Sequence, residues 1–250
     1  MESIGDLRRS TGVTADYDEI VKDKKIMENF KKGNCDGIFQ FESKTPRGIL
    51  EKINCDCFED IVAASSMNRP GPLSLKQPDL YAENKYNVEE AKMSRYWEYT
   101  EKTYGTIIYQ EQVQQICINV GKLTWGDADR VMKMMKGGHM TDTARKIYEE
   151  NRQELLERFV KGAVENGYSK EEATDLFDKM TTYTFNEGHG TGYSLISVEE
   201  MFYKVYYPND YWFAKLKYAK DDAEYQKFCS KAVVDGAVVF LPHVNYSTEK

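Results

Sequence analysis

The chain has 250 residues, of which 41% are apolar and 30% charged, and its formal net charge is −7. This composition is typical of a globular protein with a buried core and excludes a disordered chain. No apolar run approaches the about 20 residues that cross a bilayer, and the first residues have no basic and apolar leader. We therefore expect a cytoplasmic protein with no membrane partner. The acidic net charge argues against a free-standing nucleic-acid binder.

Cysteine and histidine do not form a metal-binding pattern. The five cysteines include no C-x-x-C pair, and the three histidines are scattered along the chain. A structural zinc site needs about four ligands from paired motifs. We therefore predict reduced thiols and no metal site.

The patterns predict a mainly α fold, a single helical domain with one or two short β segments. The first half should hold helices over Asp16–Lys32, Pro46–Ile53 and Phe58–Met67, an extended or β segment over Gly37–Phe41, and a loop with short helical pieces over Pro78–Lys92. The second half should hold helices over Tyr109–Val120, Gly126–Lys136, Thr141–Glu165, Ser169–Tyr183, Tyr193–Tyr207, Tyr211–Tyr218 and Asp221–Val234, then a short strand over Val238–Leu241.

The segment Asn68-Arg69-Pro70-Gly71-Pro72-Leu73 follows an apolar helical run. Proline fixes φ and lacks an N–H, so the preceding helix must stop, and the glycine permits a tight turn. Arg69 then lies on a rigid corner, where its guanidinium fork suits a phosphate or carboxylate. The alternative is a helix-stop turn with a solvated arginine.

Three other polar segments are candidates for a site. Gln110 and Glu111 open a helix after two isoleucines, which also describes an ordinary helix start. Arg130, Lys133 and Lys136 recur every third residue, which places three cations on one helix face, either solvated or binding phosphate, with Met132 and Met135 toward the core. The segment Gly188–Gly192 opens a helix whose backbone N–H groups suit a phosphate, although a close approach of two helices explains the glycines equally well.

Taken in order, five segments resemble the bacterial DNA polymerase III alpha subunit family, the family C polymerases. They are Gly37–Ser43, Asp56–Ile61, Arg69–Leu73, Tyr104–Val113, and a last group made of Phe185-Asn186, His189, Tyr193–Leu195 and Tyr207-Pro208. The resemblance covers essentially the whole chain and implies the fingers domain. It implies a lead-in from the palm over residues 1–36, fingers over 37–236 and a short strand and tail over 237–250.

The resemblance also implies roles for single residues. Arg69, Gln110 and Glu111 would line the nucleotide side of a cleft, Lys133 would meet the triphosphate, and Asn186 and His189 would lie near the nucleotide. Arg130, Lys136 and Tyr193 complete the set of residues expected to bind nucleotide or DNA. Met132 and Glu187 stand where the family has basic residues, so phosphate contact is thinner here, which suggests a divergent, phage-encoded relative.

The palm aspartates that hold two catalytic metals, in a P-D-x-D-x-D-F strand and a K-x-D-F-L-G segment, do not occur in this sequence. Two-metal phosphoryl transfer needs those carboxylates, so no catalytic residue is predicted and the chain alone should be inactive. The expected partners are dNTP, primer–template DNA and a palm-bearing polymerase segment that holds Mg²⁺. The alternative is a non-catalytic, polymerase-derived module that binds DNA or a replisome partner.

Overall fold

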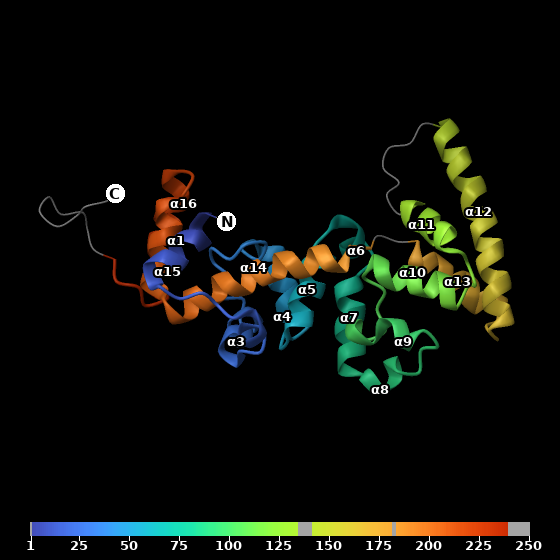
Figure 1. Ribbon diagram of the computed structural model, residues 1–250, viewed down its shortest axis with the longest axis horizontal. Coiled ribbons are helices and arrows are strands. Elements are labelled where there is room, and N and C mark those ends of the chain that lie inside the picture. Colours follow the sequence, from blue (N-terminus) through green and yellow to red (C-terminus); the bar gives the residue numbers. More distant parts are fainter. Residues whose placement is uncertain (1, 135–141, 182–183, 240–250) are drawn as a thin grey trace, which may run out of the picture. The chain divides into compact units, whose positions relative to one another are not determined.

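The computed structural model describes residues 2–134, 142–181 and 184–239, and nearly all of its regular structure is helical (Figure 1). The predicted mainly α class is confirmed. The chain divides into two compact units, residues 1–61 with 192–250 and residues 62–191. The predicted domain boundaries at residues 36 and 236 stay a prediction. No helix of the described part is long and apolar enough to cross a membrane.

The first unit is built from both ends of the chain. Its helices are α1 (Glu2–Thr11), α2 (Tyr17–Ile20), α3 (Lys24–Lys31), α4 (Lys44–Lys52), the start of α5 (Phe58–Met67), most of α14 (Glu187–Tyr206), α15 (Pro208–Lys217) and α16 (Asp222–Val234). Helix α15 packs on α1 and on α16, and α3 packs on α4. Phe30 and Phe41 meet edge to face with ring centroids 5.6 Å apart, and both are fully buried.

Two predictions in the first unit are wrong. The single helix expected over Asp16–Lys32 is two helices, because the Asp23 carboxylate accepts the N–H groups of Lys25 and Ile26 and thereby begins α3 as a new helix. The segment Gly37–Phe41 is a turn, in which φ is +74° at Gly37 and +62° at Gln40. Left-handed backbone at two positions cannot continue a strand.

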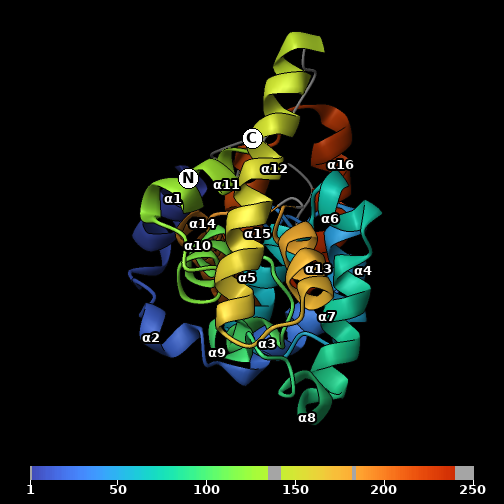
Figure 2. The same cartoon turned by 90° about the vertical axis from the view of Figure 1, so that its right-hand side faces the viewer.

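The second unit contains α6 (Pro70–Ser74), α7 (Gln77–Tyr86), α8 (Val88–Ala91), α9 (Trp97–Thr100), the 3₁₀ turn η1 (Glu101–Thr103), α10 (Gln110–Asn119), α11 (Trp125–Met134), α12 (Asp142–Glu165) and α13 (Lys170–Met180). Helices α10 and α11 pack together, as do α11 with α12 and α12 with α13 (Figures 1 and 2). Their shared core is centred on Val113, Ile116, Phe159 and Phe177, all fully buried.

Helix ends in this unit follow local chemistry that is visible in the sequence. Ser169 and Glu172 form a capping box at the start of α13, and Thr124 and Asp127 exchange hydrogen bonds at the start of α11. Helix α13 ends at Met180, three residues before the predicted end. The predicted end of α11 at Lys136, followed by glycines, lies outside the described residues.

Three further elements differ from prediction. The Pro-Gly-Pro sequence does stop α5, but it also forms the first turn of α6, because a proline at the first helical position loses no hydrogen bond. Most of the loop expected over Pro78–Lys92 is helical in α7 and α8. Helix α14 begins at Glu187 rather than Tyr193, so its glycines lie in its first turns.

The described residues contain no β-strand, and their one isolated bridge joins Tyr109 to Phe185. Val238 and Val239 are irregular, and the rest of the predicted strand, Phe240 and Leu241, lies outside the described residues. The β content of the described residues is therefore smaller than predicted, which does not change the mainly α fold class.

Candidate functional site

Two segments distant in sequence are joined at the isolated bridge. The Phe185 N–H donates to the Ile108 carbonyl at 2.9 Å, and the Gln110 N–H donates to the Phe185 carbonyl at 2.9 Å. Beneath this bridge the buried Gln112 amide accepts the N–H groups of Ile108 and Tyr109 at 2.9 Å and donates to the Thr103 hydroxyl at 2.7 Å. The bridge thus fixes the beginnings of α10 and α14 side by side.

Glu111 connects the first turn of α10 to the first turn of α14. One carboxylate oxygen accepts the Asn186 amide at 2.6 Å, and the other accepts the Glu187 N–H at 3.0 Å. The Asn186 side chain in turn accepts the His189 N–H at 2.8 Å. The carboxylate at a helix N-terminus is favoured by the helix dipole. Glu111 therefore has a positioning role that sequence reasoning did not foresee.

Arg69 lies beside the same group of residues. It precedes α6 in extended backbone, and its guanidinium donates to the Asn68 carbonyl at 2.9 Å. The guanidinium carbon is 5.1 Å from the centroid of the Phe185 ring, whose other neighbour is the His189 ring at 5.5 Å. A cation over an aromatic ring is attracted to the face of that ring, so the predicted fixed position of Arg69 has a physical basis.

Five of the nine predicted site residues are thus connected through a short series of contacts. We call the set Arg69, Gln110, Glu111, Asn186 and His189 the Arg69 cluster. Phe185 was not predicted as a site residue, although it lies between Arg69 and His189. The feature of the sequence that points to Phe185 is its position immediately before Asn186.

The electrostatics beside the Arg69 cluster are acidic. A hollow of about 420 Å³ is lined by Glu98, Glu101, Glu111 and Glu187, with Lys102 3.3 Å from the Glu187 carboxylate. Two N–H groups in the first turn of α14, those of Glu187 and His189, already have acceptors. The phosphate role expected for Gly188–Gly192 therefore gains no support, and one of these glycines, Gly190, has another use. A methyl group on Gly190 would lie 3.0 Å from the Ser66 hydroxyl, so the close approach of two helices explains that glycine.

The basic face predicted on α11 is not an array of unpaired cations. Arg130 contacts the Glu154 carboxylate at 3.0 Å and the Asn151 amide oxygen at 2.8 Å, and Lys133 pairs with Asp129 at 2.6 Å. The hydrogen bond to Glu154 raises the pKa of Arg130 above its usual value.

The remaining predictions on α11 concern Lys136 and the two methionines. Met132 packs against the core as predicted. Lys136 and Met135 lie outside the described residues.

Tyr193 belongs to the first compact unit, where its ring meets the Phe39 ring at 5.5 Å. Its assignment to nucleotide or DNA binding stays a prediction.

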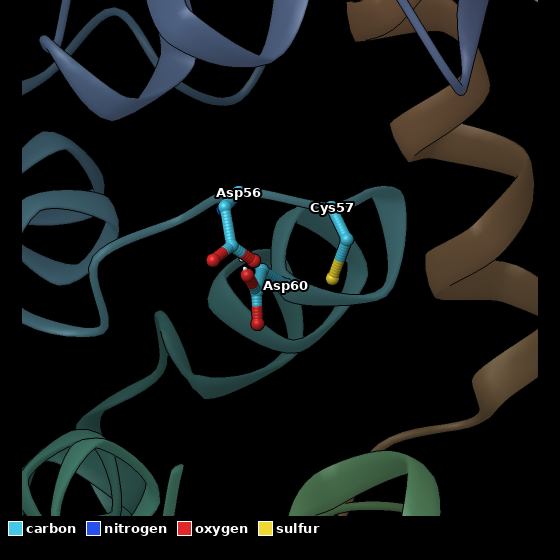
Figure 3. A group of neighbouring side chains, drawn as sticks. All are labelled: Asp56, Cys57 and Asp60. Carbon is cyan, nitrogen blue, oxygen red and sulfur yellow. Dashed lines mark hydrogen bonds between the residues drawn. The ribbon is translucent and has the colours of Figure 1, made fainter. Parts of the chain in front are cut away.

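One group of side chains in the described part has ligand atoms close enough for a metal ion: Asp56, Cys57 and Asp60 (Figure 3). Asp60 accepts the Asp56 N–H at 2.9 Å at the start of α5, as an acid in a first helical turn commonly does. Burial, with the nearby Asp60 charge, raises the pKa of the Cys57 thiol to about 12. Mg²⁺ prefers oxygen ligands in octahedral geometry, so this group does not fit it.

Comparison with known proteins places the chain in a family. Residues 3–167 match the family model described as the bacterial DNA polymerase III alpha subunit finger domain. The chain belongs to this family. It is 30% identical over 247 residues to DNA polymerase III subunit alpha of Aquifex aeolicus and 31% identical over 249 residues to that of Staphylococcus aureus strain Mu50, with 96% of this chain covered in both.

The chain spans about a fifth of the length of these curated relatives, 20% and 22%. Arg69, Gln110 and Glu111 lie inside the region matched by the finger-domain model, whereas Asn186 and His189 follow it. These relatives are bacterial, and the expectation of a phage source stays untested.

Proposed function

We propose that this finger domain forms the nucleotide-facing surface of a replicative DNA-directed DNA polymerase. In this proposal the Arg69 cluster faces the incoming dNTP and the primer terminus, and the palm-bearing part of the polymerase supplies the catalytic carboxylates and Mg²⁺. Replication would take place in the bacterial cytoplasm. The observation that carries the proposal is the convergence of five predicted residues through hydrogen bonds of 2.6 to 3.0 Å and the ring of Phe185.

Arg69 is the residue best suited to the triphosphate. Its guanidinium makes one hydrogen bond with a described residue, to the Asn68 carbonyl, and is half-buried over an aromatic face. A planar fork with remaining N–H donors can bind a phosphate through two bonds. Because Glu111 and Glu187 repel phosphate, the triphosphate should approach from the Arg69 side of the cluster. In this arrangement Glu111 and Asn186 hold the frame and His189 lies next to the bound nucleotide.

Equilibrium dNTP binding to the assembled polymerase, meaning this chain with the palm-bearing segment, tests the proposal. Arg69→Ala and Lys133→Ala should each weaken binding by about 1.5–3 kcal/mol, the value of a hydrogen bond to a charged group. Arg69→Lys should recover part of the loss, since it keeps the charge but not the fork. Lys122→Ala is the matched control, because Lys122 pairs with Glu165 on the surface. Unchanged affinity in the Arg69 and Lys133 variants would contradict the phosphate role.

Primer extension separates the polymerase proposal from the alternative of a non-catalytic binding module. The chain alone should extend no primer, and addition of the palm-bearing segment should restore synthesis. Extension by the chain alone would show that the metal carboxylates are supplied in some other way. If the added segment restores no synthesis while the chain still binds DNA, the binding module becomes the better description.

A further inference from the structure

The second unit has a cavity of about 670 Å³ that the Arg69 cluster does not include. Helices α7 and α8, the residues around Ser94 and the segment Gly105–Ile107 line it. Binding sites for small molecules commonly have volumes of about 300–1,000 Å³, so this cavity has the size of a ligand site. No residue of the Arg69 cluster lines this cavity.

The walls of the cavity are largely apolar. Leu75, Leu80, Ala91, Tyr96 and Ile107 contribute to them. Leu75 and Leu80 are 52% and 45% exposed, which is high for leucine. Solvated apolar surface in a hollow favours an apolar ligand body.

Two polar groups in the wall lack hydrogen-bond partners. Among the described residues three buried side-chain atoms are unsatisfied, and two of them, Gln77 Oε1 and Ser94 Oγ, belong to residues that line this cavity. Gln77 is 7% exposed, and its Nε2 donates to the Ile107 carbonyl at 3.3 Å. Unsatisfied buried groups are rare in folded proteins because they are costly. An amide oxygen only accepts, so the missing partner of Gln77 is a donor.

The charges around the cavity exclude a phosphate ligand. Glu83 and Glu90 line it, and its one lysine in the described part, Lys179, pairs with Asp175 at 2.6 Å. The site therefore repels anions, in contrast to the triphosphate side proposed for Arg69. Neither a dNTP nor a DNA backbone suits it.

We propose that this cavity binds an uncharged, mainly apolar small molecule that carries an N–H donor, such as an aromatic carboxamide or a lactam. The apolar body would lie against Leu75, Leu80 and Ile107. The N–H would donate to Gln77 Oε1, which turns toward the ligand because the terminal torsion of glutamine is soft. The Ser94 hydroxyl would complete the polar contacts.

Three probes that share one ring system test this proposal on the full 250-residue chain. They are naphthalene-2-carboxamide, its methyl ester counterpart methyl 2-naphthoate, and the anion 2-naphthoate. Titrations followed by methyl NMR of leucine and isoleucine should show the carboxamide binding about tenfold more tightly than the ester, the ratio for one lost hydrogen bond to a buried acceptor. The anion should bind more weakly than either. Excess dNTP should not displace the carboxamide.

Four variants keep the test independent of folding. Leu80→Trp should abolish carboxamide binding by filling the cavity, whereas Tyr86→Trp, on the same helix at a residue that is 67% exposed and outside the lining, should leave it unchanged. Gln77→Met and Ser94→Ala should reduce the preference for carboxamide over ester toward onefold. Equal binding of the carboxamide and ester to the unaltered chain, tightest binding of the anion, retained binding in Leu80→Trp, or no binding of any probe would each overturn the proposal.

Discussion

Glu111 illustrates how one carboxylate determines the geometry of the Arg69 cluster. It bonds to the Asn186 amide and to the Glu187 N–H, and both groups belong to the start of α14. Without this carboxylate, the first turn of that helix would lose an acceptor for a backbone N–H, and Asn186 would lose the contact that orients it. Sequence reasoning placed Glu111 beside a nucleotide, whereas its observed contacts are those of a residue that holds other residues in place.

We predict that Glu111→Gln destabilises the chain by about 1–2 kcal/mol, because a charge-assisted bond at a helix N-terminus is replaced by a neutral one. Urea unfolding followed by circular dichroism measures the change. Glu101→Gln is the control, since Glu101 is an exposed acid lining the same hollow whose side chain makes none of the bonds that Glu111 makes. Equal stability of the Glu111 variant and the unaltered chain would show that this contact does not hold α14.

Asp127 provides a residue with a defined pH response. It is 6% exposed; burial alone raises its pKa, but bonds from Thr124 and Arg158 outweigh burial, so the pKa of the folded carboxyl lies below its usual value of 3.8. A carboxyl whose pKa is lower in the folded state stabilises the fold above its unfolded pKa, and this stabilisation is lost as the pH falls through the folded value.

Asp127→Asn should therefore cost about 2 kcal/mol near neutral pH, the order expected for a hydrogen-bonded charge. The difference between the variant and the unaltered chain should shrink as the pH is lowered below 3.8. Urea unfolding at a series of pH values measures it. Asp129→Asn, at a half-exposed neighbour whose carboxylate pairs with Lys133, should cost under about 1 kcal/mol at neutral pH. A difference for Asp127→Asn that does not change with pH would contradict this account.

At the scale of elements, helix existence was predictable because it depends on local chemistry. The capping box at Ser169 and the Thr124–Asp127 cap depend on residue types and spacing alone. The errors arose where two local signals compete. Asp23 can continue a helix or cap a new one, and in the structure its own backbone is extended and its carboxylate caps α3. Pro70 both stops α5 and starts α6, and sequence reasoning used only the first property.

Helix α12 passes close to the end of α10 at a pair of glycines. A methyl group on Gly162 would overlap the Gly121 carbonyl, and one on Gly121 would overlap the Phe159 ring. Contacts of this kind depend on the tertiary arrangement. The sequence places Gly162 on the buried face of the helix but does not reveal its neighbour.

We predict that Gly162→Ala destabilises the chain by about 1–3 kcal/mol, the usual cost of overpacking. Gly126→Ala should be neutral or stabilising by up to about 1 kcal/mol, because its added methyl group would have no neighbour closer than the Thr124 hydroxyl at 3.8 Å and alanine lowers the entropy of the unfolded chain. Thermal unfolding of both variants measures the contrast. A Gly162→Ala protein as stable as Gly126→Ala would show that α10 and α12 separate easily.

For the whole molecule, ordered motifs carried more information than composition. Composition indicated only an acidic globular chain, whereas the order of five short segments indicated the family. The match over residues 3–167 confirms that family. The same motifs brought out five residues that lie together, although Arg130 and Lys133 pair with acids instead. Motifs record which residues matter in a family, but they do not show which partner each side chain uses. The pairing of Arg130 with Glu154 and of Lys133 with Asp129 was therefore not foreseen.

Net charge and ion pairing together predict how this chain meets DNA. The chain carries a net charge of −7, and the described cations of α11 are paired with acids. Affinity for DNA comes mainly from cations that replace the counterions of phosphates. A cation that is paired with a carboxylate must break that ion pair before it can contact a phosphate. The chain alone should therefore bind DNA no better than a non-specific protein.

We expect fluorescence anisotropy with a labelled primer–template at 150 mM salt to give a dissociation constant above about 10 µM for the chain alone, within the range of non-specific binding. Glu154→Gln, which releases Arg130 from its main partner, should tighten binding and steepen its salt dependence by about one counterion. Asp175→Asn, which removes the acid that pairs with Lys179 on α13, is the matched control for the change in net charge.

Submicromolar binding by the unaltered chain would show that cations outside α11 dominate. Equal gains in the two variants would show that total charge, rather than the cations of α11, governs the encounter with DNA.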